Sequence, residues 1–431
     1  MSINHDIRNL LDIQDSNIHF ATNCVNQRLY KGRMSKFITA KLTYTPECCK
    51  VCKKENKDFS IIKNGTQESR ISLPMMGVHR TFLLLKKQRF FCKSCSSTFV
   101  AKSEVINRFC FISNQSKSLV TLKASEAQSI TLIAQDTCIS TSSVQRFINQ
   151  YSESMPKKYD YLPKHLSFDE FKYLKGRMAF EYINAKTGTI LGVLPSRLSR
   201  DIKNHFLSRY SYAQRCAVET ITIDMNAGYE KLIKELFPKA KIIIDRFHLV
   251  QLINRSMNKL RITVMNGFRT SNSADQKKYR RLKKYWKLPL KNALDLSFTS
   301  YKNFPLFGQT TDATVVETLM SYSERLKVNY DLYQSILTAL KDKNLEQLTK
   351  ILEKPLVEGV SKDFKRSIKT LKYHLSSIKN SFLFPYNNGR IEGINNKIKV
   401  LNRVAYGYRN FENYRNRIYL HFALKRASHA S

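Results

Sequence analysis

The spacing of apolar residues changes along this chain, and each change predicts a different kind of segment. Alternating stretches such as residues 80–85 are typical of β-strands. Residues 115–153 have the pattern of short helices, and from residue 160 onward apolar strands alternate with helices. A long, basic helical stretch interrupts this alternation from roughly residue 252 to 380. The chain therefore divides into an N-terminal segment and three further regions, namely 1–40, 41–103, 115–153 and 160–431.

The strand–helix region predicts one mixed sheet. Three predicted strands follow one another through short turns and should be antiparallel, and two apolar strands then alternate with helices. These strands are 165–171, 176–184, 189–194, 217–223 and 241–244. Three antiparallel strands followed by helix–strand–helix–strand describe an RNase H-like sheet. The pattern therefore predicts an RNase H-like α/β domain with a helical insertion.

Two Cys-x-x-Cys pairs mark the 41–103 region: Cys49 with Cys52, and Cys92 with Cys95. Four thiolates suit a tetrahedral zinc ion, and two intervening residues let one tight turn aim both sulfurs at it. The gap between the pairs exceeds the usual spacing of about 15 to 20 residues, and redox-active pairs are the competing interpretation. Cys48 stands beside Cys49 and could replace it as a ligand. We expect a zinc ribbon.

The 115–153 region predicts a helix-turn-helix. A first helix begins at Ile130, a turn covers 137–140, and a second helix begins at Thr141. Apolar residues fall where two steeply crossing helices would bury them, namely Ile133, Ala134, Ile139, Val144 and Ile148. Ser142 could donate to phosphate, while Gln145 and Arg146 could reach base edges. An ordinary helical hairpin is the alternative.

Three carboxylates stand at positions that suggest metal-dependent chemistry. Asp169 lies in the first strand of the predicted sheet, Asp224 ends an apolar strand, and Glu392 lies where a loop opens a helix. Asn395 and Lys399 follow on the face of Glu392, three and seven residues later. Carboxylate oxygens are natural ligands of Mg²⁺ or Mn²⁺, and two such ions serve phosphodiester cleavage. We expect two ions bound by Asp169, Asp224 and Glu392.

Two alternatives to this ligand set remain open. Glu170 neighbours Asp169, and because strand side chains alternate, only one of the two can point into the site. We favour Asp169. Asp245 also ends a strand, one strand later than the second carboxylate should, so we interpret Asp245 and His248 as a supporting pair.

The charge of the chain indicates a polyanionic partner. Lys and Arg number 73 against 34 Asp and Glu, a formal net charge of +39. Nucleic acid is the first candidate, because neutralised phosphates release condensed counterions. An anionic membrane surface or a merely soluble basic protein are the alternatives. No apolar run is long enough to span a membrane and no signal peptide is evident. We expect a cytoplasmic, nucleoid-associated protein whose nine cysteines stay reduced.

Basic and aromatic residues interleave in two further places. Residues 277–287 of the insertion combine Lys283 and Lys284 with the only tryptophan, Trp286. A DNA-facing helix and a solvated helical face both fit this run, and Trp286 suits a core position better than stacking on an extruded base. Near the C-terminus, Arg403 and Arg409 belong to a basic, aromatic tail that could hold DNA.

Several of these motifs resemble one family, the ISL-three group of bacterial insertion-sequence transposases. The resemblance extends along nearly the whole chain and lies in the following segments: 89–95, Ser167 to Phe171, Ile223 to Met225, Asp245 to His248, Asn388 to Lys399, and Ala405 to Phe411. It implies an RNase H-like DDE catalytic domain with a helical insertion before the final glutamate. It also implies recognition of the terminal inverted repeats of a mobile element.

The sequence as a whole predicts a multidomain α/β transposase with a zinc ribbon and a helix-turn-helix before its catalytic domain. Its expected cofactors are structural Zn²⁺ and two Mg²⁺ (or Mn²⁺) per active site. Its expected partners are double-stranded DNA, both element ends and target, and a second copy of the chain, since two ends must be cut together. A non-catalytic DNA-binding regulator and a metal-dependent nuclease without strand transfer are the competing functions.

Overall fold

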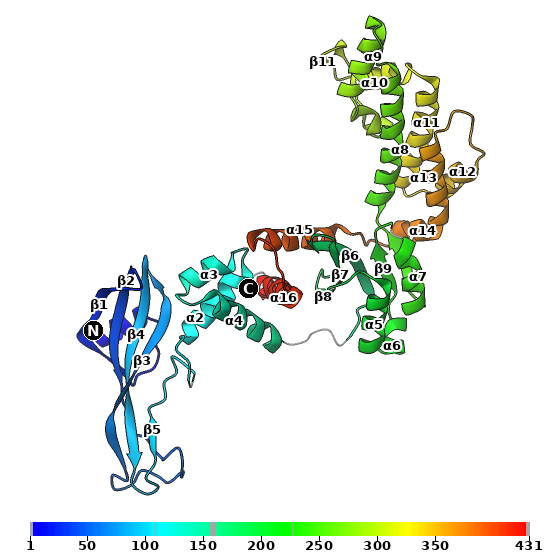
Figure 1. Ribbon diagram of the computed structural model, residues 1–431. Coiled ribbons are helices and arrows are strands. Elements are labelled where there is room, and N and C mark those ends of the chain that lie inside the picture. The colour runs from blue at the N-terminus through cyan, green and yellow to red at the C-terminus, as the bar shows by residue number, and fades with distance from the viewer. Residues whose placement is uncertain (1–2, 108, 156–160, 226, 428–431) are drawn as a thin grey trace. The chain divides into compact units, whose positions relative to one another are not determined.

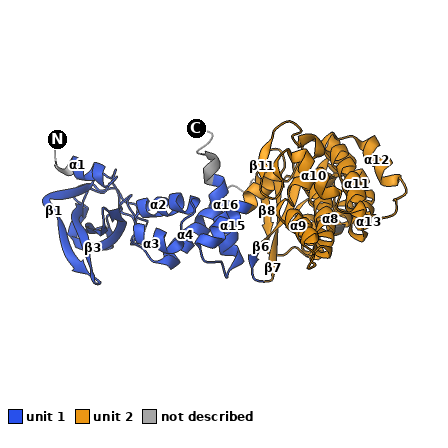
Figure 2. Ribbon diagram, turned by 90° about the horizontal axis from the view of Figure 1, so that it is seen from above, with its two compact units in different colours: residues 1–157, 173–175, 396–431 blue, residues 158–172, 176–395 orange. Residues whose placement is uncertain are grey.

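The computed structural model describes residues 3–107, 109–155, 161–225 and 227–427. Two compact units compose it (Figures 1 and 2). Unit 1 contains residues 1–157, 173–175 and 396–431, and unit 2 contains residues 158–172 and 176–395. The predicted catalytic region, 160–431, thus contributes to both units, and its first and last residues lie outside those described.

The N-terminal part of unit 1 is a five-stranded sheet with the order β1-β2-β4-β3 and with β5 paired to β4. Its strands are β1 (Ile18–Tyr30), β2 (Arg33–Leu42), β3 (Ile61–Met76), β4 (His79–Cys92) and β5 (Thr98–Val100). β2 pairs parallel with β4, whereas the other pairings are antiparallel. A bulge between Phe20 and Val25 interrupts the alternation of β1, so its strand pattern is weak in the sequence.

One face of this sheet carries a core of aliphatic side chains. Ile38, Ile71, Leu83 and Leu85 are fully or almost fully buried there. The helix α1 (Ile3–Leu10) precedes the sheet and contacts β1. Residues before position 41, which the sequence set apart as a separate segment, therefore supply two strands of the same sheet as the cysteine pairs.

Four helices of unit 1 share one core. These are α2 (Asn114–Ser125), α3 (Ile130–Asp136), α4 (Thr141–Ser154) and α16 (Phe411–Ala427). Serine side chains cap α2, α3 and α4 by accepting a hydrogen bond from a backbone N–H in the first turn. Ile133, Val144 and Ile148 are buried together with Leu420 of α16. The last helix of the chain thus completes the core formed by α2, α3 and α4.

Unit 2 contains a second five-stranded sheet, with the order β10-β9-β6-β7-β8. Its strands are β6 (His165–Leu174), β7 (Arg177–Asn184), β8 (Ile190–Leu194), β9 (Thr220–Ile223) and β10 (Lys241–Ile244). β10, β9 and β6 run parallel, while β7 and β8 are antiparallel. A mixed α/β fold is therefore confirmed, with strands close to the predicted ranges.

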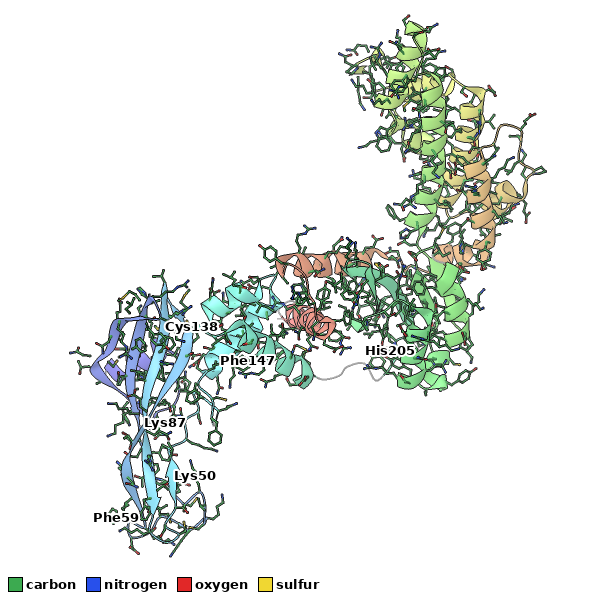
Figure 3. All side chains as sticks on the ribbon, viewed as in Figure 1. Lys50, Phe59, Lys87, Cys138, Phe147 and His205 are labelled. Atoms are coloured by element: carbon green, nitrogen blue, oxygen red, sulfur yellow. The ribbon has the colours of Figure 1, made fainter. Side chains whose placement is uncertain are left out.

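Helices α5 (Ser199–Arg209), α6 (Tyr212–Cys216) and α7 (Ala227–Leu236) lie between these strands in the chain. Phe168, Tyr182 and Phe206 pack together in the large core of the unit. Within this core the Tyr182 hydroxyl lies 2.8 Å from Nε2 of His205 on α5 (Figure 3). The aromatic packing gives the sheet a rigid base for the residues at its strand ends.

The insertion starts immediately after β10 and is mainly helical. It comprises α8 (Arg246–Gly267), α9 (Ser273–Lys284), α10 (Asp312–Met320), α11 (Glu324–Lys341), α12 (Leu345–Glu353), α13 (Lys362–Tyr373) and α14 (Leu375–Leu383). A short hairpin of β11 (Lys302–Phe304) and β12 (Gly308–Thr310) adds strands that the sequence did not predict. The chain then enters α15 (Gly389–Val404). None of the helices in the described residues could cross a membrane.

Candidate active site and cysteine cluster

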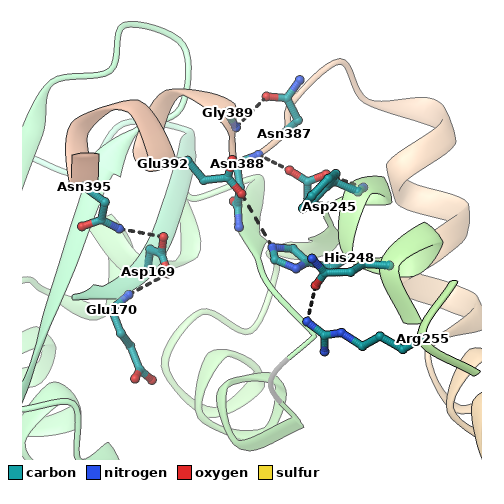
Figure 4. A network of polar contacts seen from close by, with 12 residues as sticks. Asp169, Glu170, Asp245, His248, Arg255, Asn387, Asn388, Gly389, Glu392 and Asn395 are labelled. Carbon is teal, nitrogen blue, oxygen red and sulfur yellow. Dashed lines mark hydrogen bonds and ion pairs between the residues drawn. The ribbon is translucent and has the colours of Figure 1, made fainter. Parts of the chain in front are cut away.

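Strand alternation separates the neighbouring acids Asp169 and Glu170 on β6. Asp169 accepts a hydrogen bond from the Asn395 side-chain amide at 2.8 Å (Figure 4). Glu170 accepts instead from Arg197 at 2.7 Å and from the hydroxyl of Tyr229 at 2.5 Å. The Glu170 carboxylate is thus occupied by a cation and a phenol, and Asp169 is the acid of the pair that approaches α15.

The other two predicted acids lie close enough to Asp169 to raise its pKa. Asp224 follows directly after β9, and Glu392 lies in the first turn of α15. Burial, together with the negative charges of Asp224 and Glu392, raises the pKa of Asp169 to about 6. Hydrogen bonds from the Glu170 backbone and from Asn395 oppose this shift. The three carboxylates therefore share one electrostatic site.

Asp245 holds two segments of the chain in place. It is the N-cap of α8, accepting from the Phe247 backbone N–H at 2.8 Å. Its other oxygen accepts from the Asn388 backbone N–H at 2.7 Å, just before α15 (Figure 4). His248, one turn into α8, has its Nε2 3.8 Å from a carboxylate oxygen of Glu392. This geometry fits the supporting role expected for Asp245 and His248.

Lys399 lies on the same helix as Glu392 and Asn395 and is exposed.

A buried glutamate beside the site was missed by sequence reasoning. Glu181 on β7 is 0% exposed, and neither carboxylate oxygen has a hydrogen-bond partner among the described residues. Burial, reinforced by the charge of Asp169, raises the pKa of Glu181 well above its ordinary value. Its position between Phe180 and Tyr182 looks like a solvent-facing site in an alternating strand. Phe180, Glu181 and Tyr182 are all 0% exposed, so both faces of β7 are buried at this point.

The three carboxylates are less tightly grouped than the four cysteines. Among the described residues, only the four cysteines form a group of three or more metal-binding side chains whose ligand atoms all lie within 4.8 Å of one another. The mutual repulsion that raises the pKa of Asp169 is what a divalent cation would relieve.

The cysteine cluster brings both Cys-x-x-Cys pairs together. The Sγ atoms of Cys49 and Cys95 are 3.7 Å apart, and those of Cys52 and Cys92 are 3.8 Å apart. Four sulfurs about 2.3 Å from a tetrahedral zinc would be separated by about 3.8 Å. Hydrogen bonds from Ser97 lower the pKa of Cys95 to about 6, whereas hydrogen bonding to the neighbouring thiols and burial raise the pKa of Cys52, so the four sulfurs share their protons unevenly. The cluster can bind zinc, and Cys48 lies outside it.

The candidate DNA-binding residues of unit 1 lie on its surface. Ser142 is exposed in the first turn of α4, where its hydroxyl is 2.9 Å from that of Ser140. Gln145 is half-buried and donates to the Asn149 side chain at 2.9 Å. Arg146 is exposed and lies over the ring of Phe147 (labelled in Figure 3), 5.3 Å from its centroid.

Arg403 near the end of α15 and Arg409 just before α16 are also exposed.

In the insertion, Lys283 and Lys284 are exposed near the end of α9. Trp286 is 39% exposed and lies beneath the Lys287 ammonium, 5.5 Å away. The expectation that Trp286 is a core residue is therefore wrong. The nearby rings of Tyr285 and Phe307 pack against each other and supply the aromatic core here.

A transposase family model, that of the DDE transposases of the ISL3 group, matches residues 166–418. Because this match covers more than half of the chain, the protein belongs to the ISL3 family of transposases. The sheet of unit 2, the insertion and α15 all fall within the matched residues.

Curated relatives match over shorter stretches. The transposase for insertion sequence element IS1001 of Bordetella parapertussis is 28% identical over 257 residues, which is 58% of this chain and 58% of the relative. A Lactococcus lactis protein described as an ATP-dependent protease is 35% identical over 108 residues, 25% of this chain and 34% of that protein. The matched segments therefore span about a third and three fifths of the lengths of these relatives.

Among solved structures, the Drosophila P element transposase strand transfer complex matches with a TM-score of 0.34 and 14% identity, over 73% of this chain and 92% of that one.

Proposed function

We propose that this chain is a DNA transposase that binds the terminal inverted repeats of an insertion sequence and catalyses metal-dependent DNA cleavage and strand transfer. One observation carries the proposal. Asp169, Asp224 and Glu392 come from three distant parts of the chain, yet the latter two raise the pKa of the first. In a member of a DDE transposase family, three such acids beside one sheet are the expected metal ligands. We interpret that sheet as an RNase H-like core.

In this proposal, Asp169, Asp224 and Glu392 would hold two Mg²⁺ or Mn²⁺ ions. The bound ions would activate a water or 3′-hydroxyl and stabilise the leaving oxygen. Asn395 orients Asp169 by donating to its carboxylate. Asp245 fixes the start of α15 through the Asn388 backbone, which positions the helix that carries Glu392. Lys399, farther along α15, would contact the DNA backbone.

Other parts of the chain would bind DNA. We propose α3 and α4 as a helix-turn-helix, with Ser142 on phosphate and with Gln145 and Arg146 on base edges. The cysteine cluster would hold a structural zinc ribbon. Exposed residues of the insertion, of α15 and of the loop between α15 and α16 would contact flanking or target DNA, and they are Lys283, Lys284, Trp286, Arg403 and Arg409. A dimer would bring two element ends together.

The direct test is an oligonucleotide cleavage and joining assay on the full-length protein, with and without Mg²⁺. Wild type should cut and join end-containing duplexes only with the metal, and Asp224→Asn should abolish both steps. Glu219→Gln, an exposed acid at the opposite end of β9, is the matched control and should retain activity. Mg²⁺-dependent joining that survives Asp224→Asn would exclude Asp224 as a ligand.

The same assay separates the competing functions. Cleavage without joining would indicate a nuclease. Specific end binding with neither reaction, in the presence of Mg²⁺ or Mn²⁺, would indicate a DNA-binding regulator. Either result would overturn the transposase proposal.

A further inference from the structure

The N-terminal sheet has a second face whose composition differs from that of its core. Alternation points Phe37 and Phe82 away from the buried Ile38 and Leu83, and the two aromatic residues are paired in register on β2 and β4. We call this side the arginine face and define it by six residues. They are Arg28, Tyr30, Phe37, Arg70, Arg80 and Phe82.

Three aromatic rings form a compact base on this face. The rings of Phe37 and Phe82 are stacked with their centroids 5.2 Å apart. Tyr30 packs edge-on against both, at 5.8 Å and 5.3 Å. Phe37 is only 2% exposed and Phe82 only 7%, so their ring faces are covered.

Arginines provide that cover. The guanidinium carbon of Arg28 lies 3.8 Å from the centroid of Phe37. That of Arg70 lies 4.9 Å from the centroid of Tyr30 and 5.8 Å from that of Phe82. Both arginines are exposed. Stacking on a ring restricts the rotamers of a guanidinium, while its N–H groups stay available to a ligand in the plane of the guanidinium.

The stacked arginines differ from other arginines of the chain in their ion pairing. Within the described residues, neither Arg28 nor Arg70 forms an ion pair with a carboxylate, whereas Arg197 and Arg415 in the same chain do. Glu68, farther along β3, stands opposite Lys86 in the register. Pre-oriented, unpaired and exposed arginines are suited to phosphate, which the guanidinium fork can bind with two hydrogen bonds.

More positive charge lies at one end of the face. Lys31 and Arg33 flank Gly32 in the tight turn between β1 and β2 and are exposed, and the Lys31 ammonium lies 5.8 Å from the Tyr30 ring. Arg28 and Arg80 stand on either side of Ser35 in the register of the sheet. The basic groups therefore extend from the β1–β2 turn across three strands.

We propose that the arginine face binds the phosphate backbone of duplex DNA, as a contact separate from the helix-turn-helix. The inference rests on the proposed function, because it supplies a further surface for the element end. Since the aromatic rings are already covered by arginine, bases cannot stack on them. The face therefore binds phosphates without reading sequence.

The test measures duplex binding by full-length, zinc-containing protein as a function of salt, without Mg²⁺. The variant Arg28→Met/Arg70→Met keeps an unbranched side chain over each ring but removes both charges. If each arginine neutralises one phosphate, the slope of log affinity against log salt should become shallower by about 0.9 per residue, or about 1.8 in all. The loss should be equal for end-containing and unrelated duplexes.

Two control variants accompany this measurement. Arg28→Lys/Arg70→Lys keeps both charges and should retain most of the salt slope. Lys36→Gln removes one charge from the opposite side of β2, between Ser35 and Phe37, and should leave the slope close to that of wild type. Zinc content and the thermal midpoint of each variant establish that the sheet is folded.

An unchanged salt slope in the folded Met variant, with wild type active in cleavage and joining, would overturn the arginine face and leave the proposed function standing. If wild type binds duplexes with the expected arginine dependence but never cuts them, the arginine face would stand and the proposed function would be overturned. Tighter binding of polyglutamate than of duplex, lost in the same variant, would assign the face to an acidic protein and overturn the DNA assignment.

Discussion

Asp169 is subject to opposing influences at the centre of the candidate site. Burial and the charges of Asp224 and Glu392 raise its pKa to about 6, while the hydrogen bond from Asn395 works in the other direction. A protonated carboxyl is a poor ligand for a divalent cation. The site should therefore lose affinity for Mg²⁺ as the pH falls through about 6.

Replacing Asn395 should shift that pH dependence. In Asn395→Ala the pKa of Asp169 should rise further, so the Mg²⁺ concentration for half-maximal cleavage should begin to increase at a higher pH than in wild type. Mg²⁺ titrations of cleavage at a series of pH values measure this. Asn396→Ala, which alters the exposed neighbour, is the control. Identical pH dependence in wild type and Asn395→Ala would contradict the assigned hydrogen bond.

Glu181 should make the metal-free protein less stable as the pH rises. Its pKa is raised in the folded state, so above the ordinary Glu range of about 4.3 the folded chain binds more protons than the unfolded chain. By linkage, the free energy of unfolding falls with increasing pH in that window. Glu181→Gln should reduce this dependence, leaving the part due to the raised pKa of Asp169, and be more stable than wild type at neutral pH. Urea unfolding at a series of pH values measures this. If the free energy of unfolding changes with pH equally in both proteins, the prediction is wrong.

Alternation along β6 was enough to predict that Asp169 and Glu170 face opposite ways. The partners of these residues could not be predicted, because Asn395 and Tyr229 reach them from distant helices. Asn395 was named only for its place on the face of Glu392. The ligand roles of Asp169, Asp224 and Glu392 remain predictions.

At the scale of secondary structure, α8 and α15 depend on one side chain. Asp245→Ala removes the N-cap of α8 and the acceptor for the Asn388 backbone N–H, and it should lower the free energy of unfolding by about 1 to 3 kcal/mol. Asp245→Asn retains one acceptor oxygen and should cost less. Asp331→Ala, an exposed acid on α11, should change stability by less than about 0.5 kcal/mol. Equal losses for Asp245→Ala and Asp331→Ala would contradict the tethering role.

The cysteine cluster makes a distinct prediction about metal content. Purified wild type should contain zinc, Cys92→Ser should lose it, and Cys48→Ser should keep it, because the Cys48 thiol lies outside the cluster. Elemental analysis of the three proteins, with thermal melting, measures both the metal and its contribution to stability. Zinc lost from Cys48→Ser but kept in Cys92→Ser would reverse the ligand assignment.

Elements with regular periodicity were the ones that the sequence predicted well. α3 and α4 follow the predicted helices because their apolar residues repeat at helical spacing and serines cap their starts. β1 was missed since its bulge breaks the period of two, and the β11–β12 hairpin was missed since its strands are three residues each.

At the scale of the whole molecule, segments far apart in the chain, residues 114–154 and α16, build the helical part of unit 1. Arg417 on α16 is almost fully buried and donates to the backbone oxygens of Glu126 and Gln128, which precede α3. Asn413 and Asn416 of α16 pair with Asn149 and Ser152 of α4. The sequence predicted a basic, DNA-holding tail here. A partner so distant in the chain leaves no local pattern that would predict the packing.

Arg417 should therefore matter for stability. Arg417→Ala leaves a cavity and removes the donor to the Gln128 carbonyl, while the Glu126 carbonyl keeps a bond from the Gln128 backbone N–H, and it should lower the free energy of unfolding of unit 1 by roughly 2 kcal/mol or more. Arg409→Ala, an exposed arginine before α16, is the matched comparison and should have little effect. Hydrogen exchange of α2 to α4, read alongside urea unfolding, would locate the loss. If Arg417→Ala leaves the hydrogen-exchange protection of these helices unchanged, Arg417 does not hold α16 against the segment before α3.

The dependence of α2, α3 and α4 on α16 has a consequence for synthesis of the protein. A ribosome translates all three predicted catalytic acids before it reaches Phe411, so a product truncated between these points would carry the acids on a chain whose helical module lacks its closing helix. Such fragments should be quickly degraded. Because α16 is translated after all three acids, the core of α2, α3 and α4 can be completed only once α16 has been made.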